Sequence, residues 1–198
     1  MNASFPLPGA LLRIMRAGHR ALSVAEGIGL VAAALCVFGM MFVTAVDVGF
    51  RYVIGHPLSW WYDLLMNYML PAAFYLAFSY TLAHNGHLAV EYFSNRLPPR
   101  LGQGLLALGM LASSAVLYVV FQGLSQESWH AWRNDEVIAG AILWPVWISK
   151  LILAVGIILL TLRTFHLGLC HALAVRYPNV FAALGLRERT SELDEVTT

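Results

Sequence analysis

The chain has 198 residues, of which 59% are hydrophobic and only 12% are charged. Soluble domains carry about 25% charged and roughly 45–50% apolar residues, so this chain could not cover itself with polar surface and lipid must be its main solvent. The formal net charge of +1, without any basic run, argues against nucleic acid as a partner.

Four apolar segments are long enough to cross a hydrocarbon core of about 30 Å, which takes a helix of roughly 20 residues. They cover residues 24–46, 63–83, 101–124 and 143–165. The sequence therefore predicts an all-α integral membrane protein with four transmembrane helices. The predicted domains are an N-terminal segment (1–23), the membrane domain (24–168) and a tail with a disordered end (169–198).

The positions of Lys and Arg in the connecting segments predict the orientation. The N-terminal segment holds three arginines, the link between spans two and three holds two, and the C-terminal tail holds three. The first and third connections hold one each, Arg51 and Arg133. Both termini are therefore predicted to be cytoplasmic.

The connection between the first two spans combines a charge, a turn and a pair of aromatic residues. Arg51 closes the first apolar segment, a turn with Gly55 and Pro57 follows, and Trp60 and Trp61 open the next segment. Because Trp is enriched at membrane–water boundaries, this pattern is typical of a hairpin at the membrane surface.

Two residues inside the predicted spans need partners. Pro71 is tolerable in a membrane helix if neighbouring groups satisfy the carbonyl that it frees. Lys150, the exceptional charge within a span, costs at least a few kcal/mol unless it pairs or extends to the surface. Asp63 and Asp47 lie toward the same side of the membrane. We expect Lys150 to pair with Asp63 or Asp47, within the subunit or across a subunit boundary, or else to extend to the surface.

The link from His84 to Arg100 is not a simple turn. Within residues 87–97, Leu88 and Tyr92 fall on one helical side and Glu91 and Asn95 fall on another. This pattern predicts a short amphipathic helix in the membrane interface, stopped by the prolines at 98 and 99.

The seven histidines raise the question of a haem-binding membrane anchor. All are expected in loops or at helix ends, with His166 at the exit of the fourth span, rather than at protected depth. No Ser/His/Asp set, thiol pair or clustered carboxylates have a spacing suited to catalysis. We therefore predict surface or interfacial histidines, no cofactor, no metal and no enzymatic activity.

Taken together, the motifs of this chain resemble those of the small membrane subunit of the tripartite ATP-independent periplasmic (TRAP) transporters. The first hairpin is similar to that family's pattern at Arg51, Tyr52, Val53, Gly55, Trp60 and Asp63. The link after span two is similar at His87, Val90, Glu91, Arg96, Leu97 and Pro98. Three positions depart from the pattern: Asp63 replaces Glu, Glu91 replaces Asp, and Met66 stands where an Arg is common. A pairing of that Arg with the acid is absent here or rerouted to Lys150.

The resemblance implies a non-catalytic subunit in a bacterial inner membrane, in contact with lipids. A larger membrane subunit would hold the substrate and sodium sites, and a periplasmic binding protein would deliver an organic acid. The small subunit would brace the larger one. Implied partner-facing residues are Arg51, Trp60 and Asp63 on the periplasmic side, and His87, Glu91, Arg96 and Pro98 on the cytoplasmic side.

Two other readings stay open on the sequence alone. A respiratory-type membrane anchor carrying haem or quinone would show a Soret band when it binds haem. A small exporter acting as a dimer would transport without other subunits, although no carboxylate lies near the middle of a predicted span.

Overall fold

The computed structural model describes residues 9–56, 58, 60–83, 99–140, 142–175 and 177. The amphipathic helix expected over residues 87–97 lies outside these residues. In chain order the elements are α1 (Gly9–Val53), α2 (Trp61–Leu64), the π-helix η1 (Leu65–Met69), α3 (Leu70–Ala83), α5 (Pro99–Arg133), β1 (Val137–Ile138), β2 (Trp144–Pro145) and α6 (Val146–Ala174).

Within the described residues, three helices are long and apolar enough to cross a membrane. They run over Leu12–Val53, Leu101–Arg133 and Val146–Ala174. This confirms the predicted class of an all-α membrane protein. The second predicted span falls in the successive segments α2, η1 and α3. The count of four spans stays a prediction.

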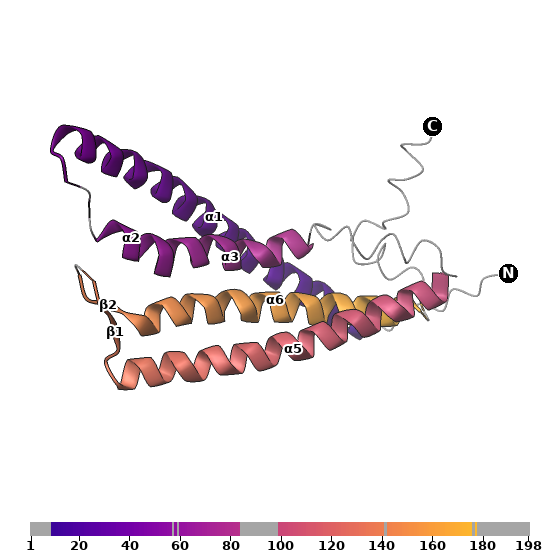
Figure 1. Cartoon of the computed structure of the whole chain (residues 1–198). Helices are drawn as coiled ribbons and strands as arrows, with labels where there is room; N and C mark the ends of the chain where they lie inside the picture. Colours follow the sequence, from indigo (N-terminus) through magenta and orange to yellow (C-terminus); the bar gives the residue numbers. More distant parts are fainter. Residues whose placement is uncertain are drawn as a thin grey trace, which may run out of the picture.

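The helices are longer than the apolar segments that predict them. Helix α1 has 45 residues, which at 1.5 Å per residue is about 68 Å, more than the roughly 40–45 Å of a bilayer with its headgroups. Helix α1 must therefore tilt or extend beyond the membrane surface. Figure 1 shows it crossing α3 and diverging from α2 toward its C-terminal end.

The ribbon has two distinct ends (Figure 1). We call the end with the α1–α2 connection and the β1–β2 hairpin the hairpin end. The opposite end, where α1 begins and α6 finishes, is the terminal end. Helices α5 and α6 lie side by side and run antiparallel between the two ends.

Helix α3 is held closely between α1 and α6. An added Cβ on Gly29 of α1 would lie 3.1 Å from the carbonyl oxygen of Leu76. An added Cβ on Gly156 of α6 would lie 2.8 Å from the carbonyl oxygen of Tyr75. Neighbouring residues of α3 thus face glycines on two helices, and the absent side chains allow the backbones to approach closely.

The partner that Pro71 requires is supplied by α6. Proline has no N–H to donate, so the carbonyl of Asn67, four residues earlier, loses its helical hydrogen bond. The Ser149 hydroxyl donates to this carbonyl at 2.5 Å. In η1, the Leu70 N–H donates five residues back to the Leu65 carbonyl. The expectation that a neighbour satisfies the freed carbonyl is confirmed.

A short antiparallel hairpin, absent from the sequence-based prediction, joins α5 to α6. Val137 pairs with Pro145, and Ile138 pairs with Trp144. Two-residue strands carry almost no periodicity, so the sequence pattern gave no signal for them. The Tyr68 hydroxyl donates to the Pro145 carbonyl at 2.5 Å and ties the hairpin to η1.

Because of the close contact at Gly156, we expect one added methyl group to lower the stability of the fold. In Gly156→Ala the new Cβ would lie 2.6 Å from the Tyr75 Cβ, and such overpacking costs about 1–3 kcal/mol. We expect a lower midpoint of thermal unfolding for the purified protein in detergent, followed by circular dichroism. Gly123→Ala is the matched control, because nothing lies within 4 Å of its Cβ. Equal midpoints for the two variants would contradict the contact.

Candidate functional site

At the hairpin end, Asp47 organises the connection between α1 and α2. Its carboxylate accepts a hydrogen bond from the Leu58 backbone N–H at 2.6 Å and one from the Arg51 guanidinium at 3.2 Å. Gly55 supplies the positive φ of +78° within this turn, a conformation that glycine adopts without strain. The Arg51 side chain is largely exposed, whereas Asp47 is buried.

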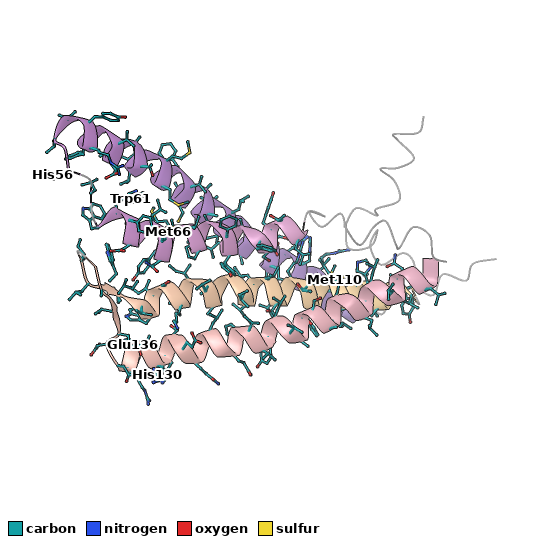
Figure 2. All side chains as sticks on the ribbon, viewed as in Figure 1. His56, Trp61, Met66, Met110, His130 and Glu136 are labelled. Carbon is teal, nitrogen blue, oxygen red and sulfur yellow. The ribbon has the colours of Figure 1, made fainter. Side chains whose placement is uncertain are left out.

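The two tryptophans of this connection differ in their exposure to the surroundings. Trp61 is buried and Trp60 is half-buried, and their rings meet edge to face with centroids 6.4 Å apart. Figure 2 shows Trp61 at the start of α2, close to His56 in the connection. Of the predicted anchor residues, Arg51 is exposed, and Trp60 and Asp63 are half-buried.

Asp63 lies against the loop between β1 and β2. An added Cβ on Gly140 would overlap the Asp63 carboxylate. One turn later the Asn67 side-chain amide donates to the Asp63 carbonyl at 2.9 Å. Asp63 therefore connects the start of the second predicted span to the hairpin between α5 and α6.

Lys150 has a different partner from the two expected ones. It forms an ion pair with Glu127 of α5, and both side chains are partly exposed. The reason is the antiparallel contact of α5 and α6, which brings these residues together. Asp47 is instead held by Arg51 and Leu58, and Asp63 lies at Gly140. The prediction of a Lys150–Asp63 or Lys150–Asp47 pair within the chain is therefore corrected to Lys150–Glu127.

The predicted cytoplasmic corner is not part of the described structure. His87, Glu91, Arg96 and Pro98 all lie outside the described residues. Their proposed contacts with a partner stay predictions.

A buried charged cluster lies toward the terminal end. Arg163 of α6 and Glu26 of α1 form an ion pair with Nε and Oε1 3.5 Å apart, and their side chains are only 3% and 1% exposed. The Ser79 hydroxyl of α3 donates to Glu26 at 2.7 Å. A third polar contact joins Arg163 Nη1 to His19 Nδ1 at 3.1 Å. The cluster therefore joins α1, α3 and α6.

His166 extends this cluster and corrects a prediction. Instead of lying at an exposed span exit, it is 8% exposed and stacks on His19 with ring centroids 6.0 Å apart. Its Nε2 lies 3.8 Å from the Sγ of buried Cys170, one turn along α6. Within the described part of the chain, no group of three or more His, Cys, Asp or Glu residues could hold a metal ion.

The sequence pattern does not single out this cluster, because Lys150 lies farther inside its predicted span than Glu26 and Arg163 lie inside theirs. Glu26 lies near the start of the first predicted span and Arg163 near the end of the fourth. Two helices that cross a membrane in opposite directions place these positions at similar depth. Opposite charges at matching depth, each costly without a partner, were the available signal. The role of this cluster is structural, because it holds three helices together.

Comparison with known proteins gives one match. The family model for the DctQ component of the tripartite ATP-independent periplasmic transporters matches residues 40–173. No curated protein and no solved structure matches the chain significantly. The matched range includes the α1–α2 connection, the β1–β2 hairpin and Arg163, whereas Glu26 and His19 precede it.

Removing one member of the buried pair should destabilise the fold strongly. We expect Glu26→Gln or Arg163→Met to lower the free energy of unfolding by about 3–5 kcal/mol, because each leaves a buried charge without its partner. The double variant should lose less than the sum of the two. Equilibrium unfolding in mixed detergent and denaturing surfactant measures these differences.

Arg13→Met is the matched control, since this arginine of α1 is exposed. Losses that add in the double variant, or equal losses in the control, would show that the pair does not act as a unit.

Proposed function

Because this chain belongs to the family of small permease subunits of TRAP transporters, the DctQ component, we propose that it is a non-catalytic subunit that braces the large membrane subunit. The family match over residues 40–173 carries this proposal. The brace acts by giving the moving parts of the large subunit a fixed neighbour in the bilayer.

The interior of the chain supports a bracing role. Close glycine contacts hold α3 between its neighbours, and the Glu26–Arg163 pair joins α1 to α6. Elements held in this way have few alternative arrangements, because an unpaired buried charge is costly. The long apolar faces of α1 and α5 remain exposed in the isolated chain. These faces give the brace a large surface for lipid and for the large subunit.

The proposed complex resides in the bacterial inner membrane. The arginine distribution supports cytoplasmic termini and a periplasmic hairpin end. The complex takes up carboxylated organic solutes by ion-coupled secondary transport, with sodium as the coupling ion. A soluble periplasmic binding protein delivers the solute, and the large subunit holds the solute and ion sites.

Two sets of residues face the partners in this proposal. Arg51, Trp60 and Asp63 form the periplasmic anchor, and the exposure of Arg51 suits this role. The second set, on the cytoplasmic side, is His87, Glu91, Arg96 and Pro98.

Co-purification tests the proposal directly. We expect the tagged chain to extract from membranes together with a much larger multi-span permease, and loss of the chain to abolish uptake of the carboxylated solute. Arg13→Met serves as the control variant that retains both properties. Purification of the chain without a large partner would contradict the proposal, and a Soret band would favour the respiratory-anchor reading instead.

A further inference from the structure

The connection between α5 and α6 begins with exposed polar residues, next to the end of α5. Three consecutive exposed residues, Asn134 to Glu136, separate α5 from β1, and the last residue of α5, Arg133, is exposed as well. The Arg133 guanidinium lies over the Trp129 ring at 5.0 Å, and His130 contacts the Glu136 carboxylate at 3.3 Å. Figure 2 shows His130 and Glu136 together at the end of α5. So many exposed polar groups in succession are incompatible with hydrocarbon.

The β1–β2 hairpin that follows nevertheless exposes large apolar side chains. Val137, Ile142 and Leu143 are 48%, 45% and 67% exposed. Apolar side chains gathered beside polar residues mark contact sites for other molecules. The rim is net acidic, because the two exposed carboxylates of Asp135 and Glu136 stand beside a single guanidinium, Arg133. The complementary partner surface is an apolar patch flanked by basic residues.

The hairpin is held in place by three contacts at its base and side. The Val146 N–H donates to the Glu136 carbonyl at 3.0 Å, and Tyr68 donates to the Pro145 carbonyl. The third contact is the Asp63 carboxylate, which occupies the space that a side chain at Gly140 would fill. An element fixed before binding loses less conformational entropy when a partner docks.

We propose that the β1–β2 hairpin is the contact of this chain for the soluble periplasmic binding protein, and that Asp63 is the residue that positions it. This inference rests on the proposed function. The hairpin lies at the hairpin end, beyond the end of α5 and the start of α6 and next to α2 (Figure 1), which in the proposed orientation is the side that a soluble protein can reach. The large membrane subunit would instead meet the long apolar flanks of the helices. Asp63 thus acts on docking through Gly140 without touching the binding protein.

Titration of the binding protein onto the complex of large and small subunits in lipid nanodiscs tests the docking surface. We expect Leu143→Ser to raise the half-saturating concentration about tenfold, as truncation of a central contact residue does. Higher salt should also weaken binding, because the rim is acidic. Val175→Ser, an exposed apolar residue at the terminal end, is the control and should bind like the unaltered complex.

The positioning role of Asp63 needs a measurement that distinguishes it from a general loss of rigidity in the hairpin. We expect Asp63→Ala and Gly140→Ala each to weaken docking of the binding protein several-fold, measured only on assembled complexes that contain the large subunit. The double variant should bind better than Gly140→Ala alone, because the added methyl group takes the space of the removed carboxylate. Such a rescue is a coupling between neighbouring residues.

Each outcome decides one of the two proposals. Unchanged binding in Leu143→Ser would overturn the docking surface, and would make the exposed hairpin a lipid contact, while leaving the bracing function intact. Independent effects of Asp63→Ala and Gly140→Ala would overturn the positioning role. A chain that never co-purifies with a large subunit would overturn the proposed function and the docking inference together.

Discussion

Two opposite charges that leave water together must stay together, and this constraint sets how α1 meets the other helices. Glu26 and Arg163 are both almost fully buried, and they lie on α1 and α6, the first and last helices of the described chain. Sliding or rotating α1 would strand one of the two charges. Because breaking such a pair costs several kcal/mol, the contact fixes the depth and rotation of α1 at the terminal end. Ser79 adds α3 to the same arrangement.

The hairpin end is fixed by a different kind of contact. There, side chains satisfy single backbone groups: Asp47 accepts from the Leu58 N–H, Ser149 donates to the Asn67 carbonyl, and Tyr68 donates to the Pro145 carbonyl. Each contact anchors one turn or one connection. A change at this end should therefore alter a local surface, whereas a change at the buried pair should alter the arrangement of whole helices. This difference suits a chain with a rigid membrane part and a separate surface for partners.

The sequence predicted the all-α class and the approximate positions of the long helices from apolar length, but it did not predict how far α1 and α5 extend beyond the apolar segments. It also predicted that the carbonyl freed by Pro71 needs a neighbouring donor, since a missing N–H always frees one carbonyl, but it did not identify Ser149 as that donor. It did not predict which acid Lys150 meets. Charge and approximate depth were compatible with several acidic residues as partners of Lys150. The antiparallel contact of α5 with α6 determines that the partner is Glu127. The burial of His166 depends in the same way on contacts between distant segments, whereas the strands of the β1–β2 hairpin are too short to show a pattern.

The correction at Lys150 changes how Asp63 should be understood. Family resemblance suggested an acid that lacks its usual Arg, because Met66 stands at that position, and a possible rerouting to Lys150. With Lys150 held by Glu127, that rerouting is not needed. Asp63 instead lies where Gly140 has no side chain, so its role is linked to a residue far along the chain. A motif residue of this kind can affect a partner without touching it, because it determines where a neighbouring surface lies.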